Sequence, residues 1–182
     1  LEAMEDALGR RTRWEHDLLG RIVKEIKADL SETSYVYDSA GRLTSRTDPK
    51  GQVTTNTYAV DNSLLTKAFT NAAVATPTIS YTYDSVYPRV STMTDGMGLT
   101  AYGYKAPGQL GAGRLASVDG PLANDLIAYN YDQVGRVIGR TIDGEANAQT
   151  LTYDLLGRKT SQVNLLGQFT FAYAGIGNRL SS

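Results

Sequence analysis

The only histidine of the chain is the first residue to consider for catalysis, because an imidazole titrates near neutral pH and can act as a general base. His16 stands in the phrase WEHDLLGR, and no phrase near it supplies a nucleophile or a partner that would orient the ring. The phrases GxSxG, HExxH, GxxxxGK and SxxK are all absent from the sequence. The sequence therefore predicts that the chain is not an enzyme.

Aspartates recur along the chain and could supply oxygen ligands for calcium. The spacing of an EF-hand loop and the GGxGxD nonapeptide are both missing, and one carboxylate per turn provides too few oxygens for a cage. The chain also has no cysteine, so it has no thiolate metal site. We expect no metal and no cofactor, and we assign the aspartates to the capping of turns.

Arginine and tyrosine are the remaining residue types that could bind a ligand. An arginine follows a turn glycine at positions 10, 21, 42, 114, 136 and 158, which could form a stripe for anions. An aspartate in the same phrase balances that charge, so we favour arginines that cover aromatic rings or bond to turns. We predict that Arg136 or Arg158 contacts an aromatic ring or a turn carboxylate.

These residues belong to a phrase that the chain repeats. It reads aromatic-x-Tyr-Asp-x-x-Gly-Arg and is strongest as WEHDLLGR, YVYDSAGR, YNYDQVGR and LTYDLLGR. Weaker copies keep part of this box, so that about eight repeats of roughly 21 residues start near residues 14, 35, 58, 81, 102, 129, 151 and 171. The box positions that we expect to build the repeats are Tyr35, Tyr37, Asp38, Gly41, Arg42, Tyr129, Tyr131, Asp132, Gly135, Arg136, Tyr153, Asp154, Gly157 and Arg158.

The elements that carry the boxes are predicted to be short antiparallel strands. An aspartate that opens a four-residue turn and a glycine that closes it are typical of a type I turn in a hairpin, and such turns recur about every ten residues. Between the turns, Thr, Val, Ile and Tyr alternate with period two. Residues 1–30 also contain good helix formers, so a short helix there stays open as an alternative. Longer loops are expected at 71–78, 106–114 and 119–127.

Composition and charge exclude several classes of partner. The 182 residues are 41% hydrophobic and 20% charged, with a net charge of −1 and a pI near 5.8, so no positive field attracts nucleic acid. No apolar run is long enough to span a bilayer, and the first residues do not read as a signal peptide. We therefore expect no nucleic-acid partner and no membrane span.

The tyrosines suggest how the repeats would associate. One hairpin cannot bury enough surface to be stable, so each repeat needs its neighbours. We expect ladders of tyrosine rings across neighbouring strands, with each hydroxyl facing water or a polar group. The positions are Tyr35, Tyr37, Tyr81, Tyr83, Tyr102, Tyr104, Tyr129, Tyr131, Tyr153 and Tyr173. A sheet of this kind would also leave unpaired edges through which the chain could self-associate.

The phrase YxYDxxGRL, followed by a second turn and a return to Tyr-x-Tyr, resembles the YD repeat of the Rhs proteins. That family includes the bacterial Rhs polymorphic toxins, the C component of insecticidal toxin complexes and the teneurins. The resemblance implies an all-β fold in which residues 1–182 are one array of antiparallel hairpins in a continuous curved or spiralling sheet. It also implies a segment of a shell that encloses a C-terminal toxin or effector domain.

The same resemblance implies the partners and the compartment. The partners would be neighbouring repeats of the same protein and the enclosed effector, and the parent protein would be secreted or displayed at the cell surface. A carbohydrate-binding or adhesin-like repeat module is the alternative, because exposed tyrosines can stack on sugar rings. The Asp-Pro-rich segment that ends the shell in many of these toxins has no counterpart, since Asp48-Pro49 stands in an ordinary repeat turn.

Overall fold

The computed structural model describes residues 2–177 and 180, and in that part the chain is all-β, as predicted. Sixteen strands form an antiparallel sheet over the described residues, and their order in the sheet follows their order in the sequence. Within each unit, an inner strand thus pairs with the strand before it and the strand after it. The chain divides into two compact units, one of residues 1–89 and 93–96 and one of residues 90–92 and 97–182.

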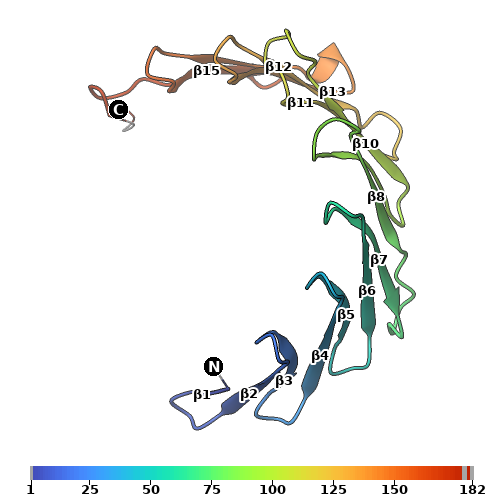
Figure 1. Ribbon diagram of the computed structural model, residues 1–182. Helices are drawn as coiled ribbons and strands as arrows, with labels where there is room; N and C mark the ends of the chain where they lie inside the picture. Colours follow the sequence, from blue (N-terminus) through green and yellow to red (C-terminus); the bar gives the residue numbers. More distant parts are fainter. Residues whose placement is uncertain (1, 178–179, 181–182) are drawn as a thin grey trace. The chain divides into compact units, whose positions relative to one another are not determined.

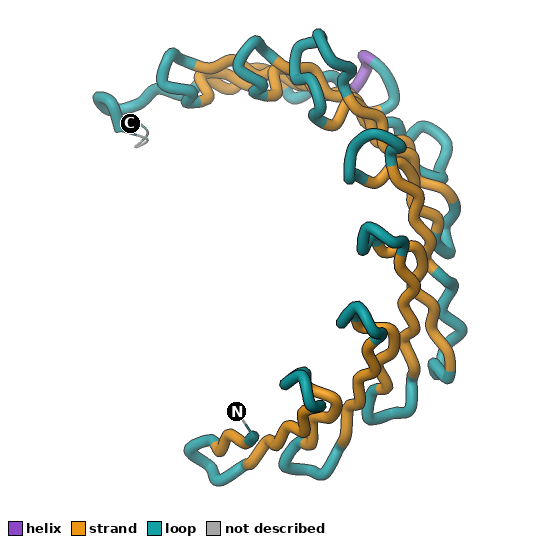
Figure 2. The backbone as a smooth tube through the Cα atoms, viewed as in Figure 1, coloured by secondary structure: helices purple, strands orange, loops and turns teal. Residues whose placement is uncertain are grey.

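The first unit contains eight complete strands that follow one another from blue to green in Figure 1. Consecutive hairpin turns lie at opposite ends of these strands (Figure 2), because every connection joins two antiparallel neighbours. The strands are β1 (Ala3–Glu5), β2 (Arg11–His16), β3 (Ile22–Ile26), β4 (Glu32–Tyr37), β5 (Leu43–Thr47), β6 (Val53–Tyr58), β7 (Leu64–Thr70) and β8 (Ile79–Tyr83).

The second unit continues the pattern with longer connections. Strand β9 (Val90–Thr94) is divided between the two units. A single 3-10 turn, η1 (Glu145–Asn147), interrupts the described part of the second unit before β14. The strands of the second unit after β9 are β10 (Leu99–Tyr104), β11 (Leu115–Asp119), β12 (Ile127–Tyr131), β13 (Val137–Ile142), β14 (Gln149–Tyr153), β15 (Lys159–Asn164) and β16 (Gly167–Thr170).

The alternative prediction of a short helix within residues 1–30 is wrong. Residues 2–30 hold β1, β2 and β3, and the described residues contain no α-helix. Two tight turns divide this segment, with the backbone N–H of Gly9 bonded to the carbonyl of Asp6 and that of Gly20 to Asp17. Intrinsic helix propensity is a weak preference, and turns about ten residues apart leave no room for a helix.

The box turns have the conformation that their residues predict. The N–H of Gly41 donates to the carbonyl of Asp38 at 3.0 Å, and the N–H of Asp38 donates to the carbonyl of Arg42 at 2.9 Å. Gly41 has a φ of 84°, in the left-handed region that glycine adopts without strain. The register shifts between Val36 and Tyr37, so the turn ends in a β-bulge.

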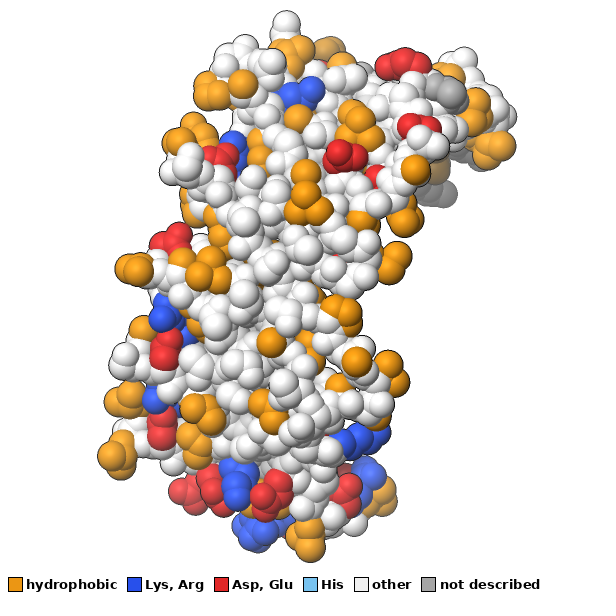
Figure 3. All heavy atoms as spheres, turned by 90° about the vertical axis from the view of Figure 1, so that its right-hand side faces the viewer, with side chains coloured by type: hydrophobic (Ala, Val, Ile, Leu, Met, Phe, Trp, Pro, Cys, Tyr) orange, Lys and Arg blue, Asp and Glu red, His pale blue; other side chains and the backbone are white. Residues whose placement is uncertain are grey.

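The sheet has almost no buried core. Among the described residues only Tyr131 and Thr33 are classed as buried, at 7% and 3% exposure, and no large side chain is fully buried. Hydrophobic side chains lie scattered over the face seen in Figure 3, and acidic and basic ones lie side by side near its margin. Because little apolar surface is removed from water, polar contacts between neighbouring hairpins must hold much of the structure together.

The three longer loops lie where the sequence predicts them. Irregular backbone joins β7 to β8, β10 to β11 and β11 to β12. The box that starts near residue 171 ends in Asn178 and Arg179, which lie outside the described residues. None of the described helical segments is long and apolar enough to cross a membrane.

Candidate functional site

The carboxylate of each complete box organises its own turn. Oδ1 of Asp38 accepts hydrogen bonds from the backbone N–H groups of Ala40 and Arg42, both at 2.9 Å, and Oδ2 accepts one from Nε of Arg42 at 2.7 Å. One side chain therefore satisfies two backbone donors and fixes the position of an arginine. The same three bonds recur at Asp6, Asp17, Asp132 and Asp154.

The arginine then reaches forward to the next box. Nη1 of Arg136 donates to the backbone carbonyl of Asp154 at 3.2 Å, and its guanidinium lies 4.8 Å from the centroid of the Tyr153 ring. Arg158 lies 4.6 Å from the Tyr173 ring and bonds to the carbonyls of Gly175 and Gly177. The prediction for Arg136 and Arg158 is confirmed, because each contacts both a carboxylate and a ring.

The first unit repeats this forward contact. Arg21 lies over the Tyr37 ring at 4.7 Å, with its Nη1 3.4 Å from the carbonyl of Asp38. Arg42 lies over the Tyr58 ring at 5.1 Å and donates to the carbonyl of Ala59 at 2.7 Å. Ala59 follows Tyr58 as Asp38 follows Tyr37, and the turn after it has the same backbone hydrogen bonds. The contact survives without the aspartate because it uses the backbone carbonyl.

From β4 onward, the tyrosine that directly precedes a box turn reaches backward to the preceding hairpin. The hydroxyl of Tyr153 donates to the carbonyl of Val137, the residue after Arg136, at 2.8 Å. Equivalent bonds join Tyr37 to Ile22, Tyr58 to Leu43, Tyr83 to Leu64, Tyr104 to Val90, Tyr131 to Leu115 and Tyr173 to Lys159. We call the forward arginine contact together with this backward tyrosine bond the repeat latch.

The repeat latch differs from the tyrosine ladders that the sequence predicts. Tyr35 lies directly opposite Arg46, Tyr129 opposite Arg140, and Tyr37 opposite Leu43. Tyr131 lies opposite Val137 and Tyr153 opposite Lys159. The expectation of rings opposite rings is wrong at these positions, because box tyrosines stand on alternate strands and the strand between carries arginine, lysine or aliphatic residues.

The same contacts shift the ionisation of the box residues. The backbone N–H of Arg42 and then its side chain hold the pKa of Asp38 below the ordinary value of 3.8. At Asp132, desolvation works to raise the pKa, but the N–H and side chain of Arg136 outweigh it and the pKa is lowered. Burial raises the pKa of the Tyr131 hydroxyl. The contacts of Asp38 and Asp132 thus favour the charged carboxylate, and the burial of Tyr131 favours its neutral phenol.

Two boxes of weaker sequence differ from this arrangement in their turns. Arg89 pairs with Asp84 through Nε and Nη2 and lies 4.6 Å from the ring of Tyr87 within its own turn. In the box starting near 102, Lys105 replaces the aspartate, and Arg114 lies 6.0 Å from the Tyr131 ring. The hydroxyls of Tyr104 and Tyr131 still bond backward.

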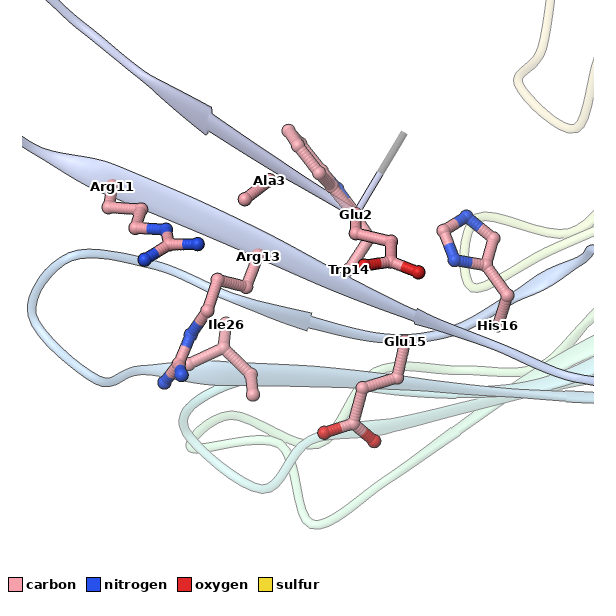
Figure 4. A pocket seen from close by; sticks show the side chains of 8 residues that line it. All are labelled: Glu2, Ala3, Arg11, Arg13, Trp14, Glu15, His16 and Ile26. Atoms are coloured by element: carbon pink, nitrogen blue, oxygen red, sulfur yellow. The ribbon is translucent and has the colours of Figure 1, made fainter.

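A separate hollow of about 530 Å³ lies at the N-terminal edge of the first unit and includes the lone histidine. Trp14 and His16 project from the opposite side of β2 to Arg13 and Glu15 (Figure 4). His16 is exposed, and the described residues hold no group of three or more His, Cys, Asp or Glu side chains that could bind a metal.

Comparison with known proteins agrees with this geometry. Residues 30–53 and 37–59 match the family model described as RHS Repeat, and these ranges contain the box of Asp38 and Arg42. No curated protein matches the chain.

Solved structures share the fold. The crystal structure of TcdB2-TccC3-Cdc42 matches 85% of the chain with a TM-score of 0.69 and 22% identity, and the Photorhabdus luminescens Tc holotoxin pore with a TccC3 mutation gives the same values. The crystal structure of TcdB2-TccC3-TEV matches 94% of the chain with a TM-score of 0.56 and 15% identity. The chain spans only 9% to 12% of the length of these chains. Residues 30–59 thus match the RHS Repeat family model, and the hairpin sheet around them has the fold of these solved structures.

Proposed function

We propose that this chain is a structural segment of a β-sheet shell that encloses a C-terminal toxin or effector domain. The observation that carries the proposal is the repeat latch, because it makes each hairpin depend on the next one for its polar contacts. A sheet held by such contacts needs no thick core, and both of its faces can meet solvent or cargo. The fold shared with the TcdB2-TccC3 structures supports the same role.

We also infer that the eight boxes form one array in which the box residues act as structural and not catalytic positions. In the first unit Arg21 and Arg42 make the forward contact, and in the second Arg136 and Arg158 make it. The same side chains thus perform the same task in both units. In this proposal the parent protein is exported and its cargo lies beyond the repeats.

The alternative is a carbohydrate-binding repeat module. Such a module needs several aromatic faces that lie free and side by side, so that sugar rings can stack on them. The rings of Tyr37, Tyr58 and Tyr153 each have an arginine guanidinium over them, and their hydroxyls are bonded to backbone carbonyls. The contacts of these tyrosines favour the shell segment over the carbohydrate-binding module. Binding to a glycan array that disappears with Tyr→Ala changes at exposed positions would support the alternative.

Limited proteolysis of the longer protein that carries this chain tests the shell proposal. Trypsin should cut the region that follows the repeats slowly while the repeats are folded, and rapidly once urea has unfolded them. The control is the same C-terminal region expressed by itself, which should be cut rapidly in both conditions. Equal rates of cleavage for this region in the native long protein and in isolation would overturn the proposal.

A further inference from the structure

Arg140 in β13 has a buried guanidinium nitrogen whose hydrogen-bonding capacity is unused. Its Nε is buried and has no hydrogen-bond partner among the residues that the structure describes. Buried polar groups are nearly always paired, so an unpaired one indicates a missing partner. Asp143 and Glu145 follow in the same connection, yet neither forms an ion pair with Arg140 among the described residues.

Two amide side chains lie in the same cross-strand row as Arg140. Arg140 is directly opposite Gln149 on β14. Since Thr150 is opposite Val163, Gln149 is in turn opposite Asn164 on β15. Directly opposite residues in an antiparallel sheet project to the same face with Cβ atoms about 5 Å apart. Three strands therefore present one guanidinium and two amides along a single line.

This row borders a small cavity in the second unit. The cavity has a volume of about 170 Å³ and is lined by Arg140, Ile142, Asn147, Gln149 and Asn164. A second hollow of about 290 Å³ shares Asn147 and Asn164 with it and adds Leu165 and Leu166. The η1 turn brings Asn147 to both hollows. No carboxylate belongs to either lining, so the cavity contains hydrogen-bond donors without an anionic partner.

The donors suit an anion with two oxygens in a plane. A guanidinium presents parallel N–H groups that match a carboxylate, and it remains charged at every accessible pH. The Oδ1 of Asn164 already accepts the backbone N–H of Leu166 at 2.9 Å, which leaves the NH₂ of that amide as a donor. Gln149 and Asn147 can add further amide N–H groups. The apolar Ile142, Leu165 and Leu166 would lie beside the carbon part of such a ligand.

The equivalent arginine of an earlier repeat lacks these features. Arg46 in β5 stands opposite Tyr35 and Thr54, as Arg140 stands opposite Tyr129 and Gln149. Arg46 is exposed, and a four-residue turn from Asp48 to Gly51 follows it where η1 follows Arg140. Arg46 is therefore a matched control for the same sheet position without the cavity.

We propose that Arg140, Asn147, Gln149 and Asn164 form a binding site for a carboxylate group. This site is separate from the repeat latch and does not depend on the shell proposal. The carboxylate could come from a small organic acid or from an acidic side chain of a polypeptide. Both sources share the same recognition chemistry, so the test includes one probe of each kind.

The test follows the side-chain Nε–Hε signals of the chain by ¹⁵N NMR at constant ionic strength. Sodium acetate should shift the Arg140 signal in a saturable way, while equivalent sodium chloride should not, and the Arg46 signal should stay in place in both titrations. The signals are identified by their loss in Arg140→Lys and Arg46→Lys. Arg140→Gln should abolish the response, with far-UV circular dichroism showing that the variant keeps its strands.

A peptide of six glutamates distinguishes the two sources. Half-saturation at a concentration at least tenfold below that of acetate, with additional shifts at Leu165 and Leu166, indicates a polypeptide carboxylate. Equal half-saturation per carboxylate indicates a small acid. Gln149→Ala should weaken binding of either probe severalfold. An Arg140 signal that moves no more than the Arg46 signal with both probes would overturn the proposal.

Discussion

At the scale of single residues, the box arginine makes three different contacts with one planar group. In Arg136, Nε binds the carboxylate of Asp132, Nη1 binds the carbonyl of Asp154, and the guanidinium face covers Tyr153. A lysine has the same charge but no planar fork, so it cannot make the three contacts together. The shape of the guanidinium, and not its charge alone, joins the repeats.

Arg136→Lys is therefore expected to destabilise the chain although the net charge is unchanged. A lysine cannot keep the carboxylate, the carbonyl and the ring contact together, and the contacts that are lost should lower the free energy of unfolding by about 1–2 kcal/mol. Urea unfolding followed by circular dichroism measures this change.

The matched control is Arg10→Lys. Arg10 pairs with Asp6 in its own turn, its side chain is 67% exposed, and no bond to a following box is found for it among the described residues. An exposed pair of this kind should change the free energy of unfolding by less than about 0.5 kcal/mol. Equal effects of the two substitutions would contradict the role of the forward contact.

Tyr153→Phe tests the backward half of the repeat latch. It keeps the ring under Arg136 and removes only the hydroxyl bond to the Val137 carbonyl, which is 2.8 Å long. We expect a loss of about 0.5–1.5 kcal/mol in the free energy of unfolding, measured in urea. Tyr35→Phe is the comparison, since its hydroxyl lies 3.5 Å from Glu25, at the limit of a hydrogen bond. If the two variants are equally stable, the backward bond contributes nothing.

At the scale of the hairpin, the turn is specified locally and its glycine is required by the backbone. Gly41 has a φ of 84°, and a Cβ there would meet only the Nη1 of Arg21 at 3.7 Å. The space is therefore adequate, and the cost of a larger residue is conformational. Residues other than Gly, Asn and Asp are disfavoured at a positive φ of this size.

Gly41→Val and Gly41→Asn should consequently differ. The valine variant should lose about 1–2 kcal/mol or more of unfolding free energy, because a β-branched residue is strained at positive φ. Asparagine tolerates that conformation, as Asn62 does in the next box turn with a φ of 70°. The two variants are compared by thermal and urea unfolding. Similar losses for both would place the cause in packing against Arg21 and not in the backbone.

Structural features that are encoded within about ten residues can be predicted from the sequence. Contacts that depend on the neighbouring hairpin cannot. Asp38 and Gly41 lie in one turn, so their roles follow from turn chemistry alone. The Tyr153 bond to Val137 spans 16 residues, and only the sheet register brings its two ends together. The sequence does contain a signal, because from Arg21 onward each arginine that follows a turn glycine precedes the tyrosine over which it lies by 15 to 17 residues.

The Arg140 site could not be predicted because its geometry depends on a connection of unusual shape. Asp143-Gly144 predicts an ordinary turn, whereas the chain forms η1 and places Asn147 beside the row of Arg140 and Gln149. The alternative of a helix in residues 1–30 is wrong for a related reason. Pairing with neighbouring strands overrides the helix formers there. The intrinsic helix propensity of a residue carries no information about that pairing.

At the scale of the whole molecule, the recurrence of the box makes stability depend on pH in a defined direction. The carboxylates of Asp6, Asp17, Asp38, Asp84, Asp132 and Asp154 all have a pKa below the ordinary value of 3.8. A lowered pKa in the folded state means that the contribution is fully present above 3.8 and is lost as the pH falls through the folded pKa values.

We therefore expect the urea midpoint to be nearly constant between pH 7 and pH 5 and to fall steeply below pH 4. Several boxes lose their carboxylates in the same range, so the slope should correspond to more than one proton. Asp38→Asn should be less stable than the parent chain at pH 6, and the gap should narrow at pH 3. A gap that is the same at both values would show that Asp38 acts without its charge.

The latches join only adjacent hairpins, and this determines how far a local change should spread. Each forward contact links one box to the next, and almost no buried core connects distant strands. Stability in such an array is close to a sum of nearest-neighbour terms. Opening of one junction should then expose the strands beside it and leave remote strands protected.

Amide hydrogen exchange of Arg136→Lys tests this locality under native conditions. Exchange should accelerate severalfold in β12, β13, β14 and β15, which flank the altered junction, and should remain unchanged in β3, β4 and β5 of the first unit. Arg42→Lys is the reciprocal variant and should accelerate exchange in β4, β5, β6 and β7 while β13 and β14 stay protected. The reason is that each arginine bonds only to its own box and the following one. A uniform acceleration over all strands in both variants would mean that the sheet opens as a single cooperative unit, and the sheet would then owe its stability to something other than contacts between neighbouring repeats.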